Sequence, residues 1–164
     1  MSEIELVKSK VARYLKEIFP SAEQNEQSHW TVSFESTRVW IAIEKGFVPK
    51  SDKNKNWHMK HDIPNILVKV WATILVNVPR SPGLFKWVAT EGQNWMLGGT
   101  RVVLGNEGEC SLLFTYSIAG ETMDPGEFKN AVMSVVTVAN HLDDIAQEKF
   151  GGKRFIDLKI EDLK

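Results

Sequence analysis

Two groups of side chains have the residue types that bind metal ions or transfer protons. The first is His58, His61 and Asp62, which bring two imidazoles and a carboxylate within five residues. Zinc accepts such ligands when a third or fourth donor completes the site. The neighbouring asparagines and Pro64 are typical of a loop, however, and no further set of ligands accompanies the histidines. A solvated loop is the better interpretation, and we expect no metal and no cofactor.

The second group is His141 with Asp143, Asp144 and Glu148. A histidine beside a carboxylate is one component of general acid–base catalysis, but the chemistry also needs a nucleophile or a bound substrate within reach. The sequence shows no nucleophile near these residues. We therefore interpret His141 as a surface histidine on a helix and expect a protein that is not an enzyme.

Cys110 is the one cysteine, so no internal disulfide and no cysteine-based metal cluster can form. It alternates in register with Leu112 and Phe114, which places its thiol on the apolar face of a strand. A buried thiol is inert unless nearby positive charge lowers its pKa. The first sixteen residues mix charges at helical spacing and do not resemble a secretory signal. We expect a cytoplasmic protein.

Composition limits the possible partners. The chain has 164 residues, of which 43% are hydrophobic and 25% are charged. These values predict a single folded domain over residues 1–164 and argue against a membrane span. The formal net charge of −1 provides no overall field for a nucleic-acid backbone. Five lysines crowd the segment that holds Trp57, but lysines in such a setting more often mark a solvated loop than a nucleic-acid groove.

Hydrophobic periodicity predicts the elements that position these side chains. Alternating apolar residues predict strands at about 30–34, 39–43, 66–78, 101–104 and 110–118. Apolar residues at helical spacing predict an N-terminal helix that ends before Pro20, a short helix that begins at Ser81-Pro82, and a long helix from Asp124 to Phe150. An irregular lysine-rich loop is expected at about 46–65. The layer rules then favour an α+β domain: a five-stranded, largely antiparallel sheet with helices packed on it.

The second half of the chain resembles a known family. The relevant stretches are LVKVWATILVNVP, SPGLFKWVATEGQ, TRVVLGNEGECSLLFTYSIAG and MDPGEFKNAVMSVVTVANHLDDIAQEKFGGKRF. Their order and patterns are similar to the type III secretion chaperone-like fold, and within it to the bacterial YbjN-like group. The resemblance implies a non-enzymatic protein, commonly a homodimer, that binds segments of other polypeptides. It carries no individual functional residue over to this sequence.

Tryptophan placement suggests where such binding would occur. Trp40 and Trp71 fall on the strand faces opposite the main valine rows, and strict alternation adds Leu75 to the same face. Exposed aromatic patches commonly mark contact surfaces. Alternatively, the second helix, which carries Phe85 and Trp87, or a dimer mate covers this face. The candidate partner-binding residues are Trp40, Trp71, Leu75 and Trp87.

Two functions from different classes fit these observations. The first is a chaperone-like protein that holds a polypeptide segment of a partner, with no membrane and no nucleic acid involved. The alternative is a small-molecule-binding or regulatory domain, whose ligand would lie under the lysine-rich loop.

Overall fold

The computed structural model describes residues 2–26, 28–34, 37–46, 51–61, 63–106 and 108–158, without the side chains of Asp52, Asn54 and His58. The helices are α1 (Glu3–Ile18), α2 (Asp52–Lys60), α3 (Pro82–Ala89) and α4 (Pro125–Phe150), with short 3-10 turns η1 (Glu91–Gln93) and η2 (Phe155–Asp157). The strands are β1 (Glu23–Gln24), β2 (Trp30–Phe34), β3 (Thr37–Lys45), β4 (Ile66–Pro79), β5 (Gly99–Leu104), β6 (Glu109–Ala119) and β7 (Lys153–Arg154).

The strands form one antiparallel sheet in the order β1-β2-β3-β4-β6-β5, and β7 pairs with β4. The predicted α+β class is therefore confirmed, but the sheet has seven strands where the sequence predicted five. The two additional strands, β1 and β7, have two residues each. Strands of that length are too short to show an alternating pattern, so periodicity does not detect them.

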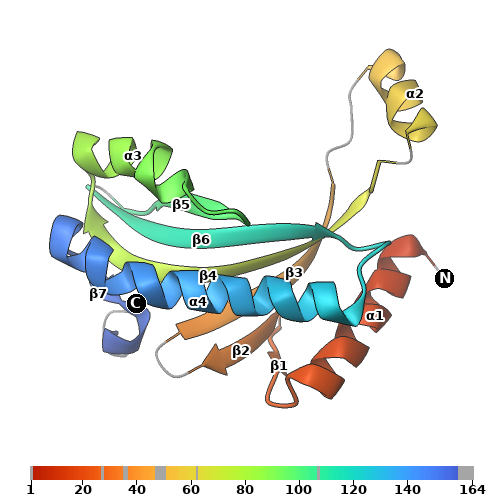
Figure 1. Cartoon of the computed structure of the whole chain (residues 1–164), viewed down its shortest axis with the longest axis horizontal. Coiled ribbons are helices and arrows are strands. Elements are labelled where there is room, and N and C mark those ends of the chain that lie inside the picture. Colours follow the sequence, from red (N-terminus) through yellow and green to blue (C-terminus); the bar gives the residue numbers. More distant parts are fainter. Residues whose placement is uncertain are drawn as a thin grey trace.

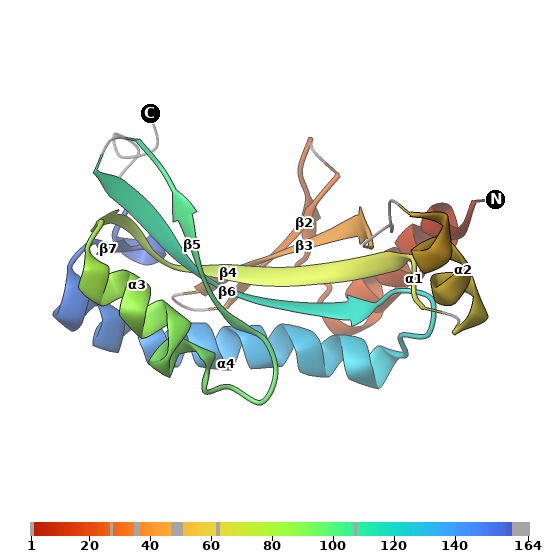
Figure 2. The ribbon, with the colours of Figure 1, turned by 90° about the horizontal axis from the view of Figure 1, so that it is seen from above.

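Helix α4 lies along the sheet and covers one of its faces (Figures 1 and 2). It begins as the sequence predicts, because the Asp124 side chain accepts a hydrogen bond of 2.7 Å from the Glu127 N–H, and Pro125 occupies the first turn. Its apolar stripe packs on β4, β6 and β3. Helix α1 lies beside it, and Tyr14 of α1 meets Phe128 of α4 at a ring distance of 5.9 Å.

The core lies between this pair of helices and the sheet. Val68, Val70 and Ala72 of β4 are completely buried there, as is Phe114 on the neighbouring strand β6. Helix α3 packs on the same side of the sheet as α4 (Figure 2), with Trp87 against Phe150 of α4 at 5.6 Å. The helices α1, α3 and α4 thus cover one face together.

A bulge in β4 overturns one part of the predicted pattern. Thr73 pairs with Leu113, but the next register pair is Leu75 with Leu112. Residues directly opposite each other in an antiparallel pair point to the same side, so Leu75 joins Leu112 on the helix-covered face. Leu75 is completely buried, and its predicted place beside Trp71 is wrong. A bulge adds one residue to one strand and reverses the faces of the side chains after it, and in β4 the reversal ends at a second register shift between Leu75 and Val78.

The segment between β3 and β4 contains a helix where the sequence predicted an irregular loop. Helix α2 stands away from the sheet at the end of the β3–β4 hairpin (Figure 1). Its Trp57 and Met59 are exposed, at 56% and 70% of their accessible surface. Residues 47–50 and Asp62 of this segment lie outside the described residues.

Candidate functional site: the open face of the sheet

The sheet face opposite α1, α3 and α4, here called the open face, has two stacked tryptophans at its centre. Trp40 of β3 and Trp71 of β4 are directly paired across the two strands. Their rings are 6.3 Å apart and nearly parallel, at 15°. Both side chains are half-buried. The helices α1, α3 and α4 lie on the other side of the sheet, and the short turn η2 contacts β3 and β4 beside this centre, so the two half-buried rings keep part of their apolar surface in contact with solvent.

Other rings and cations surround the two tryptophans. His29 meets the edge of Trp71 at 5.7 Å, and Phe155 of η2 meets Trp40 at 5.4 Å. We call these four residues the aromatic cluster. The Nζ atom of Lys69 lies 5.5 Å from the Trp71 ring centre, a distance at which a cation is attracted to the face of an aromatic ring. The guanidinium carbon of Arg38 likewise lies over the Phe155 ring, 5.3 Å from the ring centre. The cluster is therefore apolar in its centre and positive at its margins.

A cavity of about 160 Å³, here called the hollow, adjoins the cluster above β4, β6 and β5. It is lined by Lys69, Trp71, Arg101, Val103, Leu113 and Thr115. Strand register explains this set, because Trp71 pairs with Thr115, and Leu113 pairs with Arg101. The hollow thus has Trp71, Val103 and Leu113 as its apolar surface and two cations at its rim.

The two cations differ in their pairing. Lys69 forms an ion pair of 3.2 Å with Glu44 of β3, and the Glu44 side chain remains 52% exposed. Arg101 is exposed on β5, and within the described part of the chain no carboxylate pairs with it. An exposed and unpaired guanidinium offers five donors in a planar fork that suits a carboxylate.

Strand β5 is the last strand on this side of the sheet, so no strand of the described chain pairs with its outer edge. Its beginning is tied to η1, because Gln93 Nε2 donates a hydrogen bond of 3.0 Å to the Thr100 carbonyl. Its end is open to solvent, with Val103 at 49% and Leu104 at 64% exposure. A sheet edge of this kind can accept another strand.

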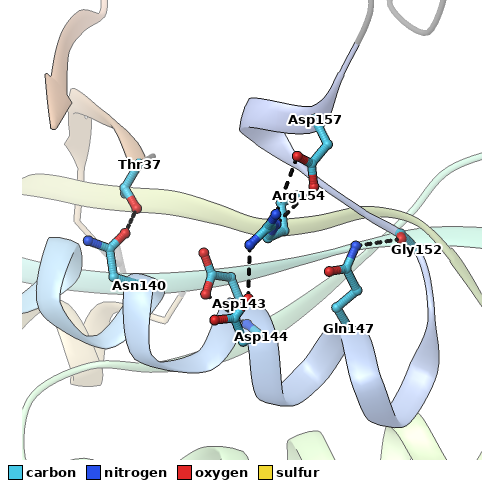
Figure 3. A network of polar contacts seen from close by, with 8 residues as sticks. All are labelled: Thr37, Asn140, Asp143, Asp144, Gln147, Gly152, Arg154 and Asp157. Carbon is cyan, nitrogen blue, oxygen red and sulfur yellow. Dashed lines mark hydrogen bonds and ion pairs between the residues drawn. The ribbon is translucent and has the colours of Figure 1, made fainter. Parts of the chain in front are cut away.

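The C-terminal segment positions Phe155 on the cluster. Strand β7 pairs with Leu75 and Val76 of β4, beyond the stretch of β4 that pairs with β3. Arg154 then connects two elements, with ion pairs of 2.9 Å to Asp144 of α4 and 2.8 Å to Asp157 of η2 (Figure 3). The Gln147 side chain donates to the Gly152 carbonyl. These contacts join the long helix to the segment that carries Phe155.

The pKa values of two carboxyl groups in this region shift in opposite directions. The hydrogen bond from Arg154 lowers the pKa of Asp157 and raises that of Arg154 itself. Burial raises the pKa of Asp143, while its hydrogen bond from the Asp144 N–H opposes that change. Thr37 of β3 donates to the Asn140 side chain in the same network (Figure 3). The network gives structural contacts to Asp143 and Asp144, two of the acidic residues near His141.

The four predicted partner-binding residues do not lie together. Trp40 and Trp71 meet on the open face, as their strand positions indicated. Leu75 and Trp87 lie in the helix-covered core, at 0% and 6% exposure. The partner-binding role of all four remains a prediction, but burial leaves only Trp40 and Trp71 available for direct contact. Helix α3, the helix predicted to begin at Ser81-Pro82, packs on the opposite face, so it does not shield the two tryptophans.

The remaining predicted chemistry is dispersed. His141 packs edge-on against Trp95 at 5.9 Å, and His61 lies 4.7 Å from Trp57 on α2. The side chain of His58 and all of Asp62 lie outside the described residues. Cys110 is buried as predicted, and burial raises its thiol pKa despite the opposing charge of Arg80. Within the described residues no group of three potential metal ligands comes together.

Sequence reasoning missed most of the hollow. Leu113 and Thr115 alternate with the predicted inward row of β6, so periodicity contained a signal for their face. Arg101 and Val103 belong to a strand that was predicted, but their proximity to Trp71 depends on the sheet order. Phe155 has no such signal, because it follows two glycines and lies beyond the last predicted element.

Two larger cavities lie on the helix-covered side of the sheet. One of about 430 Å³ borders α1 and includes Leu6, Lys10 and Glu121. The other, of about 460 Å³, lies between α4 and the segment before β5 and includes Met96 and Met133. Neither contains any of the four predicted residues.

Comparison with known proteins gives the family. The sequence matches none of the curated proteins with which it was compared. Among the described residues, no helix is both long enough and apolar enough to cross a membrane. Residues 58–158 match the model of TY-Chap1, described as T3SS (YopN, CesT) and YbjN peptide-binding chaperone 1. This range includes Trp71, Phe155 and the whole hollow, and it confirms the resemblance read from the sequence. The chain therefore belongs to the TY-Chap1 family of peptide-binding chaperones.

Proposed function

We propose that this protein is a non-catalytic chaperone that holds a polypeptide segment of a partner on the open face. The observation that carries the proposal is the stacked pair of half-buried tryptophans, Trp40 and Trp71, on the sheet face opposite α1, α3 and α4. Partly exposed tryptophans leave apolar surface in contact with water, which is unfavourable. Tryptophan is also among the residues most enriched at the energetic centres of interfaces. Membership of a peptide-binding family supports a polypeptide as the ligand.

The proposed mechanism combines side-chain burial with backbone pairing. An apolar side chain of the segment covers the tryptophan rings and removes their exposed surface from water, which favours binding by about 25 cal/mol per Å² of apolar surface before the cost of ordering the segment. The backbone of a longer segment pairs with the outer edge of β5, where the exposed Val103 and Leu104 mark the open end of the strand.

A library selection tests the proposal without knowledge of the partner. Immobilised protein is exposed to a phage-displayed library of random twelve-residue peptides, and the enriched peptides are synthesised with a fluorescent label. We expect binding that weakens at least tenfold in Trp71→Ala, because loss of a central tryptophan at an interface typically costs more than about 2 kcal/mol. Hydrogen exchange of the β5 amides should slow when the peptide is bound.

The matched control is Met133→Ala on α4, an exposed apolar residue on the opposite side of the sheet. It should leave peptide affinity unchanged. A library that yields no enriched peptide, or peptides whose affinity depends on Met133 and not on Trp71, contradicts the proposal.

The same proposal includes a cytoplasmic homodimer. The resemblance to secretion chaperones implies the homodimer, and the exposed apolar residues Met96 and Leu97 near α4 support it, since apolar patches of this kind mark contact surfaces. The single buried thiol fits a reducing compartment. Light scattering coupled to size exclusion should give twice the mass of the chain, and a monomer at micromolar concentration contradicts the dimer while leaving peptide binding unaffected.

A further inference from the structure

The hollow beside the aromatic cluster has a composition that favours one class of peptide. Its surface is apolar where Trp71, Val103 and Leu113 meet, and its rim carries the cations Lys69 and Arg101. Its volume of about 160 Å³ is the size of one large side chain. A ligand that fills it must therefore present an apolar group with negative charge next to it.

We propose that the open face selects acidic segments, in which a large apolar side chain enters the hollow and a neighbouring carboxylate pairs with Arg101. This inference rests on the proposed function and specifies its substrate class. Arg101 is the stronger determinant of the two cations, because Lys69 already has Glu44 as a partner and the guanidinium of Arg101 has no carboxylate partner in the described chain. A bound carboxylate thus meets an available charge and displaces no existing ion pair.

The geometry of an extended segment suits this arrangement. Residues i and i+2 of a strand point to the same side and lie roughly 7 Å apart. An acidic residue two positions from the apolar one consequently faces the same rim. Arg101 and Val103 of β5 have this same spacing, and both line the hollow. The edge strand β5 therefore presents a positive charge and an apolar side chain at the spacing of the acidic and apolar residues in such a segment.

A nucleic acid fits the surface less well. Phosphate backbones bind where several cations follow one another along a groove, and each neutralised phosphate adds to the affinity. The hollow has two cations, and one of them is already paired with Glu44. The open face is better suited to one or two carboxylates beside apolar side chains.

The peptide library selection tests the inference when it is run on three proteins in parallel: wild type, Arg101→Glu, and Lys129→Glu. Both variants change the net charge equally. Arg101 lies on the rim of the hollow, whereas Lys129 is exposed on α4 on the helix-covered side. Overall charge therefore cannot explain a difference between them. Because Arg101 is exposed, each variant should melt within a few degrees of wild type.

Peptides enriched on wild type should contain aspartate or glutamate two positions from an aromatic or large aliphatic residue, at least twice as often as the unselected library. On Arg101→Glu this acidic preference should disappear or turn toward lysine and arginine, while Lys129→Glu should retain it. For one synthesised acidic peptide, Arg101→Glu should weaken binding about tenfold and Arg101→Gln about threefold, as solvent-exposed charge pairs have modest energies.

The outcomes separate this inference from the proposed function. Enriched peptides that require Trp71 but show no acidic preference, or the same preference on Arg101→Glu, overturn the acidic selectivity and leave peptide binding intact. Failure to enrich any peptide on the folded wild-type protein overturns both. Enrichment of acidic peptides that bind equally well to Trp71→Ala contradicts the role of the hollow.

Discussion

The two faces of strand β4 differ in what covers them. On one face Val68, Val70 and Ala72 are completely buried beneath α4. On the other, Lys69 and Trp71 are half-buried and meet aromatic rings and a hollow. Adjacent residues of one strand thus serve different purposes. The covered face has no apolar surface left to offer, so it stabilises the fold, while the open face retains apolar surface and charge that a ligand can use.

The largest effect should come from the covered face. Phe128→Ala removes a completely buried ring that lies against Tyr14 of α1 and against Phe19, which follows that helix. Truncations of this kind cost about 3–5 kcal/mol, from lost transfer energy and the cavity left behind. Urea unfolding followed by circular dichroism measures the loss. A cost below about 1 kcal/mol would contradict the role of the covered face in stabilising the fold.

Trp71→Ala should have a smaller effect on stability and a large effect on peptide affinity. The ring is half-buried and has one stacking partner in Trp40, and such a pair adds about 0.5–1.5 kcal/mol beyond area burial. We expect the free energy of unfolding to fall by roughly 2 kcal/mol. Peptide affinity should nevertheless fall at least tenfold. Equal unfolding costs for Trp71→Ala and Phe128→Ala would contradict the distinction between the faces.

Phe155→Ala tests how the C-terminal segment shapes the open face. Its ring contacts Trp40 edge-on at 5.4 Å. Loss of this contact should cost about 1 kcal/mol and shift tryptophan emission to longer wavelength as Trp40 becomes more exposed. Phe85→Ala is the matched control, because Phe85 is 42% exposed on α3. An emission spectrum that changes in both variants or in neither would show that Phe155 does not specifically shield Trp40 from solvent.

The smallest effect concerns the acidic network of α4. Burial raises the pKa of Asp143 above its ordinary value of 3.8, so the folded state binds the proton more tightly than the unfolded state. The resulting stabilisation is complete below pH ~4 and is lost as pH rises through the raised pKa. Asp143→Asn should therefore raise the melting temperature at pH 7 by about 1–2 °C and have no advantage at pH ~3.5. Melting curves across this range measure it, and an equal gain at both pH values would refute the explanation.

Local signals identified most of the fold. The Ser81 and Asp124 caps both form, with hydrogen bonds of 3.1 and 2.7 Å to backbone N–H groups. The alternating pattern placed β2 to β6 and oriented Trp40 and Trp71 correctly. These features depend on residues close together in sequence, whose spacing is directly visible.

Most of the errors arose where a distant partner decides the outcome. Leu75 changes sides because β4 accommodates an extra residue opposite β6, and nothing in the alternation of β4 itself marks that position. Helix α2 was missed for a local reason, because it forms in a polar segment that lacks a clear amphipathic stripe. Strand β7 exists only because β4 provides an edge for it.

By itself the sequence determined the class of the fold, the long capped helix and the opposite faces of the central strand, because periodicity and caps act over a few residues. Only the tertiary structure decided the candidate site. Lys69, Trp71, Arg101 and Leu113 come from three strands, and their meeting depends on the sheet order β4-β6-β5. Strand order results from packing of the whole chain, since each pairing must bury apolar surface on one side and satisfy backbone hydrogen bonds on both edges.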